Sequence, residues 1–535
     1  MATFQIDDCD IPFEPGDTII RAAERAGIEI PHYCWHPGLS VAANCRMCLV
    51  ELLPPPGRKA MMLDVLRWDA EAQQYVKEQK PKLVPACQQL VSAGMQVRSD
   101  TSDHASHARA AVQEFLLLNH PVDCPICDQA GECFLQDYWL SQGPNKKRMP
   151  DEVIHKPKAV VFGPHIVYDA ERCIVCTRCV RVSQELAKDP VLSVSQRGNF
   201  DEITVAPGRQ LDHDYSLMTE FVCPVGALTS KEFRFKARVW FLRSVRSVCV
   251  GCATGCNAYT DYDPRDSKVY RYRPRENQAV NKYWMCDAGM LDYLRIHEGR
   301  VVEPSVDGEN VPRKAALEKA AALLGDVPGQ MLAVVLGAEF SQEENAALLA
   351  LGKSLHAAAY FEAGRPSGKA DGILMHADKN PNAAGVRQLL GANLLPIEEL
   401  VSCLKAKSLT HVITLGSMLK EPPVADELSQ LPGIVRIVLA SHTGPLSTGA
   451  QVVLPVTTWA ETEGTYVNAQ GLAQISEQAI SPQGLALPAW KWVAHLARAL
   501  GRTISSNTLT EARALSDPPR PGATADSNIQ PGAQP

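Results

Sequence analysis

The placement of its cysteines is the feature that most constrains how this chain can fold. Sixteen of the 17 cysteines lie before residue 290, most of them in groups with two residues between neighbours. The N-terminus MATFQIDDCDIPF has no basic segment followed by an apolar run, so we expect no signal peptide. Disulfides are rare in the reducing cytosol, and clustered cysteines there indicate ligation of a metal or a cofactor.

Charge and hydropathy exclude two classes of protein. The formal net charge is −7, whereas a nucleic-acid-binding protein normally carries a basic surplus, so we expect no nucleic-acid partner. No uncharged apolar run reaches the length of about 18 residues that a membrane helix needs, and we expect any membrane association to go through a partner. A length of 535 residues predicts about three to five domains.

Fifteen cysteines and one histidine divide into four sets of four candidate ligands. Three sets have the spacings C-x₁₀-C-x₂-C-x₃₈-C, C-x₂-C-x₂-C with a distant Cys-Pro, and C-x₂-C-x₃-C-x₂₉-C, and the remaining set places a histidine shortly before a cysteine triplet. In chain order the sets are Cys34, Cys45, Cys48 and Cys87; His120, Cys124, Cys127 and Cys133; Cys173, Cys176, Cys179 and Cys223; and Cys249, Cys252, Cys256 and Cys286. Cys9 and Cys403 are left over.

The spacing of the third set carries the most chemical information. A C-x₂-C-x₂-C loop followed by a distant Cys-Pro is a variant of the bacterial ferredoxin pattern. Three thiolates on one tight loop can bind three irons of a cubane, while the remote Cys223 binds the fourth. Zinc loops more often use isolated C-x₂-C pairs, so this set predicts a 4Fe–4S cluster.

Zinc stays open as an alternative for the other sets when each is taken alone. The first set has a longer first interval than plant-type ferredoxins, but a β-hairpin with an Asp-Asp turn and a helix from Asp17 as N-cap to Gly27 as stop precede it. That arrangement suits a ferredoxin-like fold around a 2Fe–2S cluster. The second set is also a common zinc set, and its cysteines could be unligated core residues. A ferredoxin loop in the same chain favours His120 as the fourth ligand of a 4Fe–4S cluster.

Outside the cysteine sets the chain changes character several times. Residues 54–81 are rich in proline and charge and predict a surface insertion. The basic run at residues 231–246 predicts a solvated face or a linker. Beyond about residue 300, apolar runs such as MLAVVLG alternate with helical patterns such as SQEENAALLALGKSL, which is typical of an α/β layer with a largely parallel sheet.

Four segments together resemble one protein family. IPHYCWHPGLSVAANCRMCLVE, NHPVDCPICDQAGECFLQD, CIVCTRCVR with FVCPVGAL, and SVCVGCATGCN with NKYWMCDAG are similar to the family of the NADH-quinone oxidoreductase G subunit. This is the large iron–sulfur subunit in the peripheral arm of respiratory complex I. The resemblance is dense up to about residue 300, and VVLPVTTWAETEGTYVNAQGLAQ resembles part of the family's molybdopterin-oxidoreductase-like domain.

The resemblance implies a multidomain α+β and α/β chain. Ferredoxin-like N-terminal domains that bind Fe–S clusters are followed by a truncated α/β molybdopterin-oxidoreductase-like domain. The expected domains are a 2Fe–2S ferredoxin-like domain at 1–97, a His(Cys)₃-ligated 4Fe–4S domain at 98–140, a 4Fe–4S ferredoxin-type domain at 141–243, a 4Fe–4S domain of the Mo/W-oxidoreductase type at 244–300, the shortened α/β domain at 301–514 and a disordered tail at 515–535.

The resemblance also implies cofactors, partners and a place in the cell. The first set would bind one 2Fe–2S cluster and the other sets three 4Fe–4S clusters, with neither molybdopterin nor FMN in this chain and no catalytic residues of its own. The cluster of the set that ends at Cys286 occurs only in some bacterial members and is thought to lie off the main electron path. Electrons would come from an FMN/NADH-binding subunit and leave toward quinone-reducing subunits. The chain would lie on the cytoplasmic face of the bacterial inner membrane, reaching the membrane arm only through other peripheral-arm subunits.

Two departures from the family pattern and two other functions remain to be weighed. Ala43 stands where the family often has glycine, and the C-terminal domain is far shorter than usual. The alternative is an iron–sulfur subunit of a soluble NAD-linked hydrogenase, diaphorase or formate dehydrogenase. A formate dehydrogenase needs a molybdenum-ligating cysteine, for which Cys403 in a helical segment is a poor candidate, and a hydrogenase needs more cysteines than remain after Cys286. A zinc-stapled scaffold, the other class, would be colourless.

Overall fold

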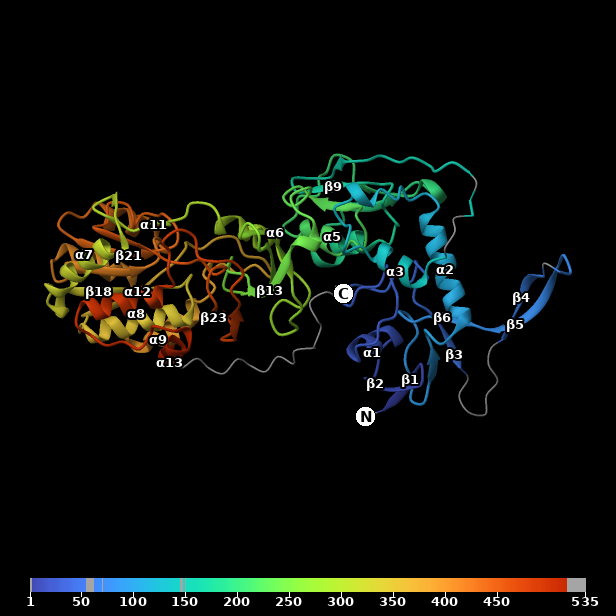
Figure 1. Ribbon diagram of the computed structural model, residues 1–535, viewed down its shortest axis with the longest axis horizontal. Coiled ribbons are helices and arrows are strands. Elements are labelled where there is room, and N and C mark those ends of the chain that lie inside the picture. The colour runs from blue at the N-terminus through green and yellow to red at the C-terminus, as the bar shows by residue number, and fades with distance from the viewer. Residues whose placement is uncertain (1, 54–61, 70, 145–147, 150, 517–535) are drawn as a thin grey trace. The chain divides into compact units, whose positions relative to one another are not determined.

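The computed structural model describes residues 2–53, 62–69, 71–144, 148–149 and 151–516. Within these ranges the chain forms two compact units, Met1–Trp240 and Phe241–Pro535, which we call the N-terminal unit and the C-terminal unit. In Figure 1 the colour runs from blue to green through the first and from green to red through the second. The predicted disordered tail falls almost wholly on residues 517–535, which lie outside the described residues.

The N-terminal unit begins with a five-stranded sheet. Its strands follow the order β2-β1-β7-β3-β6, and only the β1–β7 pair is parallel. Their bounds are β1 Thr3–Ile6, β2 Cys9–Pro12, β3 Leu49–Leu53, β6 Leu83–Pro85 and β7 Gln96–Arg98. Asp7 and Asp8 both have positive φ angles, 47° and 67°, as a two-residue hairpin turn of this kind requires. The predicted Asp-Asp turn is therefore confirmed.

Helix α1, Ile19–Arg25, packs its apolar face into the core of this sheet. The predicted stop is confirmed, because Gly27 has a φ angle of +73° just beyond the helix. The predicted N-cap is wrong, since the helix is preceded by Thr18. The Asp17 carboxylate cannot cap the helix because it accepts the backbone N–H of Glu14 at 2.7 Å and pairs with Arg25.

The predicted surface insertion forms a hairpin of its own. Strands β4, Met62–Asp69, and β5, Gln74–Pro81, pair antiparallel along their whole length and join no other sheet. Leu66 and Tyr75 are each 66% exposed, as expected of a ribbon that extends from the surface. Residues 54–61 and 70 of the same segment lie outside the described residues.

The rest of the N-terminal unit consists of short elements around loops. Ser102 accepts the backbone N–H of Ala105 and so caps α2, which packs against α3. A three-stranded sheet has the order β12-β9-β8, and β10 pairs with β11. The bounds are α2 Asp103–Leu117, α3 Phe134–Gln142, β8 Val160–Val161, β9 Ile166–Tyr168, α4 Arg178–Arg181, β10 Leu192–Ser195, β11 Glu202–Val205, α5 Leu217–Phe221 and β12 Leu228–Ser230.

The C-terminal unit opens with an antiparallel sheet of three strands in the order β13-β14-β15, followed by α6. Next comes a sheet of seven strands in the order β17-β16-β22-β21-β20-β18-β19, parallel from β22 to β19. The bounds are β13 Arg243–Val248, β14 Asn257–Asp263, β15 Lys268–Pro274, α6 Asp287–Leu291, β16 Ser305–Val306, β17 Glu309–Asn310, β18 Leu332–Gly337, β19 Ala359–Ala363, β20 His411–Leu415, β21 Val435–Ala440 and β22 Val452–Pro455.

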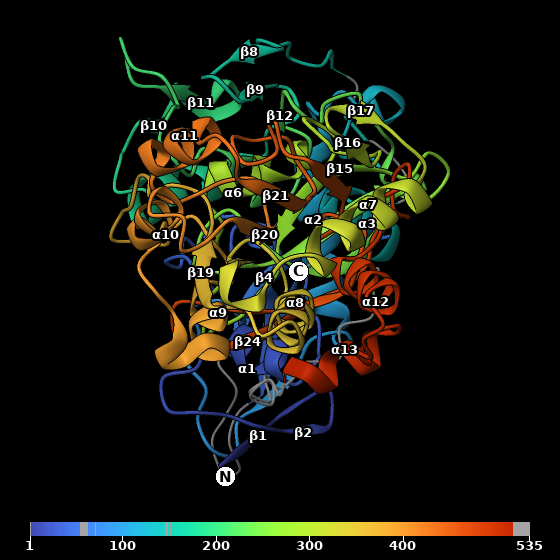
Figure 2. The ribbon, with the colours of Figure 1, turned by 90° about the vertical axis from the view of Figure 1, so that its left-hand side faces the viewer.

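Helices cover both faces of the seven-stranded sheet. Leu332, Val334 and Leu336 of β18 face one core, and the alternate Ala333 and Val335 face another. The first core is covered by α7, α8, α9, α12 and α13, the second by α10 and α11, and α8 lies beside α12 and α13 (Figure 2). The bounds are α7 Arg313–Gly325, α8 Gln342–Ser354, α9 Ala383–Leu390, α10 Ile397–Lys405, α11 Pro422–Gln430, α12 Ala489–Ala499 and α13 Leu509–Ser516, with a hairpin of β23 Gly464–Val467 and β24 Ala473–Ser476. The predicted α/β layer is confirmed.

Within the described ranges, no helix combines the length and the apolar character that crossing a membrane requires.

Candidate metal centres

The structure gathers the first cysteine set beside the five-stranded sheet. The thiol of Cys34 hydrogen-bonds with those of Cys45 and Cys87, and Cys48 hydrogen-bonds with Cys87. The backbone N–H of Cys34 also points at the Cys45 sulfur, 3.5 Å away. Cys45 is half-buried and the other three are buried. Hydrogen bonds from Cys45 and Cys87 hold the pKa of the Cys34 thiol well below its usual value. All four residues therefore lie around one point.

The loop between Cys34 and Cys48 owes its tight path to left-handed backbone at two positions. Ala43 has a φ angle of 51° and Arg46 one of 60°. Left-handed backbone suits glycine better than alanine. The departure noted at Ala43 is thus tolerated with the backbone conformation that glycine would adopt there.

The second set follows α2 and leads into α3. Cys124 begins a short 3₁₀ helix, Cys124–Ile126, which Cys127 ends, and Cys133 directly precedes α3. Burial raises the pKa of the Cys133 thiol to about 12 and lowers that of His120 to about 4. The imidazole is therefore neutral at pH 7, which is the form that binds metals.

His120 has one hydrogen bond that bears on ligation. The backbone N–H of Val122 donates to its Nδ1 at 3.1 Å, so the lone pair is on Nδ1 and the proton on Nε2. An iron ligand must present a lone pair to the metal. Ligation by His120 thus requires either that Nδ1 exchanges the Val122 N–H for iron, or that the proton moves to Nδ1 and frees Nε2.

The third set surrounds a cavity of its own. All four cysteines line it together with Tyr168 and Ile203. Burial raises the pKa values of Cys173, Cys176 and Cys223 to about 11, although a hydrogen bond from the Tyr168 hydroxyl opposes this effect at Cys173. The N–H of Val175 also points at the Cys173 sulfur at 3.4 Å. A cavity walled by four thiols suits the cubane that the spacing predicts.

The fourth set lies in the C-terminal unit, between β13, β14 and α6. All four cysteines are buried. The backbone N–H groups of Gly251 and Gly289 point at the sulfurs of Cys249 and Cys286, at 3.4 and 3.3 Å. A methyl group on Gly289 would lie 3.2 Å from the Cys249 sulfur and 3.4 Å from that of Cys286. Glycine at this position thus leaves room beside both sulfurs.

The donor chemistry of the four sets fits iron–sulfur centres, because thiolates are the ligands that such clusters use and the thiols are mostly buried. Across the part of the chain that the structure describes, no three or more His, Cys, Asp or Glu side chains are grouped so as to hold a metal ion directly. Cys9 is exposed, and Cys403 is half-buried and packs against the apolar core under α10 and α11.

Sequence reasoning missed an ion pair that ties the second set to the third. Arg172 donates two hydrogen bonds to the Asp123 carboxylate, at 2.9 and 2.6 Å. Each residue directly precedes the first cysteine of a triplet, Asp123 before Cys124 and Arg172 before Cys173. Opposite charges at matching positions of two motifs were the signal in the sequence.

The basic run at residues 231–246 is more than a solvated face. Arg238 donates to the backbone carbonyl of Cys127 at 2.6 Å and to that of Pro125. The N–H of Phe235 donates to the buried carboxylate of Asp128 at 3.0 and 2.9 Å. The start of this run therefore holds the loop of the second set, and its end forms β13.

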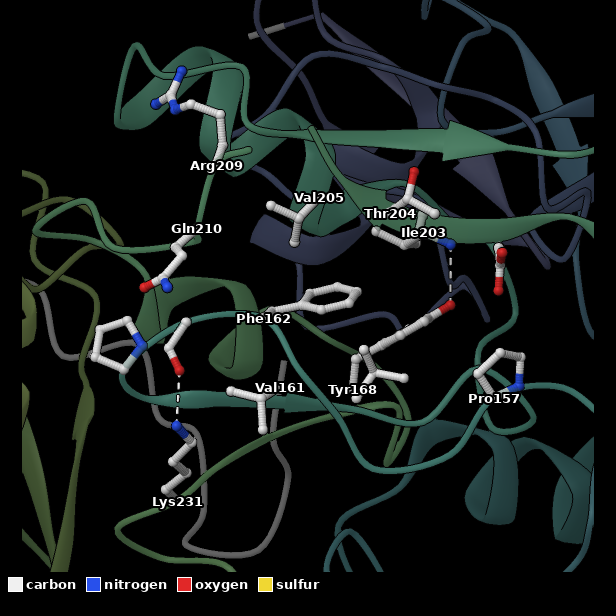
Figure 3. Close-up of a pocket in the computed structure, with 14 residues that line it drawn as sticks. Pro157, Val161, Phe162, Tyr168, Ile203, Thr204, Val205, Arg209, Gln210 and Lys231 are labelled. Atoms are coloured by element: carbon white, nitrogen blue, oxygen red, sulfur yellow. Dashed lines mark hydrogen bonds between the residues drawn. The ribbon is translucent and has the colours of Figure 1, made fainter. Parts of the chain in front are cut away.

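A second cavity, of about 750 Å³, adjoins the third set (Figure 3). Tyr168 and Ile203 line both cavities. The Tyr168 hydroxyl accepts the N–H of Ile203 at 3.0 Å, and the ammonium group of Lys231 donates to the carbonyl of Gly163 at 2.8 Å. Tyr168 thus forms a wall between this cavity and the four cysteines.

Four protein-family models match the chain. They describe a 2Fe-2S iron-sulfur cluster binding domain at residues 1–102, an NADH-ubiquinone oxidoreductase-G iron-sulfur binding region at 109–148, the ferredoxin-like domain of NADH-quinone oxidoreductase subunit 3 at 163–229, and a molybdopterin oxidoreductase at 391–499. The chain is therefore an iron–sulfur protein with 2Fe–2S and 4Fe–4S binding domains ahead of a molybdopterin-oxidoreductase domain. The predicted fold class is confirmed.

Curated relatives narrow the class further. The chain is 35% identical over 347 residues to the NADH-quinone oxidoreductase G subunit of Rickettsia felis, covering 64% of this chain and 47% of that protein. It is 37% identical over 306 residues to a mitochondrial NADH dehydrogenase (ubiquinone) iron-sulfur protein 1 of Solanum tuberosum, covering 57% of this chain and 37% of the relative. The matched part of the chain is homologous to the large iron–sulfur subunit of NADH-quinone oxidoreductase, as the resemblance implied. The chain spans less than half the length of these relatives.

Among solved structures, the chain is 28% identical to an NAD⁺-reducing [NiFe]-hydrogenase in the H₂-reduced state. That match has a TM-score of 0.36 and covers 44% of this chain and 91% of the hydrogenase chain.

Proposed function

We propose that this chain is an iron–sulfur electron-transfer subunit of an NADH:quinone oxidoreductase of the complex I type. The observation that carries the proposal is the set of loops that gather fifteen cysteines and His120 into four mostly buried groups. The homology to the large iron–sulfur subunit of NADH-quinone oxidoreductase supports it. Such a subunit needs ligands and buried surroundings for its centres but no substrate pocket of its own.

The proposed ligands follow the four sets. One 2Fe–2S cluster is held by Cys34, Cys45, Cys48 and Cys87, and three 4Fe–4S clusters are held by His120, Cys124, Cys127 and Cys133, by Cys173, Cys176, Cys179 and Cys223, and by Cys249, Cys252, Cys256 and Cys286. We propose the domain boundaries stated above as the limits of the regions that carry them. Bound iron–sulfur centres supply one-electron oxidation and reduction without proton transfer or group transfer.

The residues around the ligands determine how easily such centres take up an electron. Burial keeps water from the sulfurs, and backbone N–H groups at Val175, Gly251 and Gly289 point at ligand sulfurs. Both effects tune reduction potential. The Arg172–Asp123 pair fixes the second loop against the third, so that the distance between their ligands is set by a partly buried ion pair.

The proposed partners are an FMN/NADH-binding subunit that delivers electrons and the peripheral-arm subunits that pass them toward quinone. The chain would contact the membrane arm only through these subunits, on the cytoplasmic face of the bacterial inner membrane. For the α/β domain we propose a structural role without molybdopterin. Its two cores are filled with apolar side chains, and Cys403 packs against one of them.

Affinity isolation of the full chain from native membranes, under anaerobic conditions, tests the proposal. We expect a brown protein with about fourteen irons per chain, from one two-iron and three four-iron centres, and a matching amount of acid-labile sulfide. We also expect a flavoprotein and quinone-reducing subunits to co-purify. Stoichiometric zinc or no labile sulfide would contradict the cluster assignment, whereas co-purification with a soluble hydrogenase or formate dehydrogenase would contradict only the host complex.

A further inference from the structure

Two arginines are buried between the first and third cysteine sets. Arg178 and Arg181 flank Cys179 in α4 and are 3% and 7% exposed. A fully buried arginine is rare unless it is paired with an anion. Their surroundings therefore need an explanation.

Arg181 connects the two sets through their backbones. Its guanidinium donates to the carbonyl of Cys34, a ligand of the first set, and lies 3.4 Å from the carbonyl of Cys176, a ligand of the third. It donates as well to the carbonyl of Ser40, in the loop that follows Cys34. One side chain thus reaches both groups of ligands.

Arg178 repeats this arrangement one helical turn earlier. Its guanidinium donates to the carbonyl of Trp35, next to Cys34, and to that of Val222 at 3.2 Å, next to Cys223. Both arginines therefore span the same two loops, and every hydrogen-bond acceptor named for them is a backbone carbonyl.

Neither arginine has a carboxylate partner among the described residues, whose ion pairs involve other side chains. The Nε–H of each is buried and finds no acceptor in the described part of the chain. A buried guanidinium without a counter-ion costs several kcal/mol, because it has lost its hydration. The protein must provide negative charge nearby, and the thiolates of Cys34 and Cys176 belong to the ligand sets closest to hand.

We propose that Arg178 and Arg181 form a shared cationic bridge that raises the reduction potentials of the first and third iron–sulfur centres together. The inference rests on the proposed function, since it requires that both sets bind clusters. An added electron makes a centre more negative, and a buried positive charge stabilises the more negative state, because the Coulomb attraction is weakly screened there. Since the same two guanidinium groups lie beside both sets, both potentials depend on them.

The test compares Arg181→Gln, Arg181→Lys and Arg178→Gln in the full chain, with Arg197→Gln as the control. Arg197 is exposed, so the control removes the same charge from the surface of the same unit. Each purified variant is analysed for iron and labile sulfide and then titrated potentiometrically with low-temperature EPR detection. We expect Arg181→Gln and Arg178→Gln to shift both midpoint potentials to more negative values. Arg181→Lys, which keeps the charge, and Arg197→Gln should stay close to wild type.

The outcomes separate this inference from the proposed function. Wild-type protein without cluster signals would contradict the proposed function. Wild-type signals together with unchanged midpoints in an iron-replete Arg181→Gln protein would overturn the bridge alone, as would a shift confined to one centre. An Arg181→Lys protein that shifts as far as Arg181→Gln would overturn the role of charge. If Arg181→Gln loses iron, Arg178→Gln decides, since it removes the same charge and leaves the hydrogen bond to Cys34 in place.

Discussion

Gly226 lies directly against Cys127, although the two residues belong to different cysteine motifs. A methyl group on Gly226 would lie 2.3 Å from the Cys127 sulfur and 3.1 Å from the Cβ atom of Gln129. Gly226 follows Cys223 of the third set, whereas Cys127 belongs to the second. Nearby, the N–H of Phe134 donates to the carbonyl of Pro224 at 3.1 Å, which joins the residues after Cys133 and Cys223. The second and third sets are therefore packed as one body.

The first prediction concerns this contact. Gly226→Ala should disturb the second centre although it changes no ligand, because the new methyl group displaces the Cys127 sulfur. We expect the second EPR signal to be lost or altered while the third persists, with a loss of about 1–3 kcal/mol in unfolding free energy from overpacking. Gly372→Ala is the matched control, since open space surrounds that glycine. An unchanged second signal in a fully loaded Gly226→Ala protein would contradict the packing described here.

The second prediction concerns His120. A neutral imidazole in place of a thiolate makes the site less negative by one charge, so an added electron is held more easily. His120→Cys, where the cluster assembles, should therefore have a lower midpoint potential than wild type. His120→Ala should lose the second cluster or hold it weakly while the other centres persist. Low-temperature EPR at graded potentials measures both, and an unaltered signal in His120→Ala would show that His120 is not a ligand.

The third prediction concerns Cys403. Its half-buried side chain packs against the core under α10 and α11, and we propose no ligand role for it. Cys403→Ser should leave electron transfer from NADH to quinone nearly intact in the assembled complex and lower the unfolding free energy by about 1 kcal/mol. Activity assays and thermal unfolding measure the two effects. A collapse of activity with fold and clusters retained would indicate a catalytic site in the α/β domain.

The fourth prediction concerns acid stability of the sheet that carries the fourth set. Asp261 is 1% exposed in β14 and pairs with Arg271 at 2.7 Å and Arg273 at 2.6 Å. Burial alone would raise the pKa of Asp261, but the two arginines hold it well below its usual value. A lowered folded pKa means that the pair stabilises the fold fully above the unfolded pKa of about 3.9, and that this contribution disappears as the pH falls toward the folded pKa.

Asp261→Asn should therefore lower the unfolding free energy by about 3–5 kcal/mol at pH 7, because it leaves two largely buried arginines without their anion. The difference between the two proteins should shrink as the pH falls below about 4. Thermal unfolding of both proteins between pH 7 and pH 3 measures this. A constant difference across that range would contradict the assigned ion pair.

Local patterns in the sequence predicted much of the fold, since they depend on neighbouring residues. The Asp-Asp turn, the Gly27 stop and the alternation of β18 between two cores all follow from rules that act within a few residues. The prediction of Asp17 as N-cap failed, because Glu14 and Arg25 compete for its carboxylate. Propensity alone does not rank such competing partners.

The cysteine spacings also indicated which residues form each candidate centre, because motif spacing is local within three of the sets. The contacts between sets were not predictable in this way. Arg172 and Asp123 are 49 residues apart, and Arg238 and Cys127 are 111 apart. Such pairings depend on how the loops fold onto one another, which a single sequence does not encode in any short pattern.

The contact from Arg181 to the Cys34 carbonyl spans 147 residues of chain, and this separation has a consequence for biosynthesis. A ribosome releases the first cysteine loop long before it has made Arg181. During that interval the carbonyls of Cys34, Trp35 and Ser40 lack their guanidinium donors. We infer that the nascent N-terminal domain completes its packing only when α4 emerges, so that delivery of the first cofactor to a growing chain would meet an unfinished site.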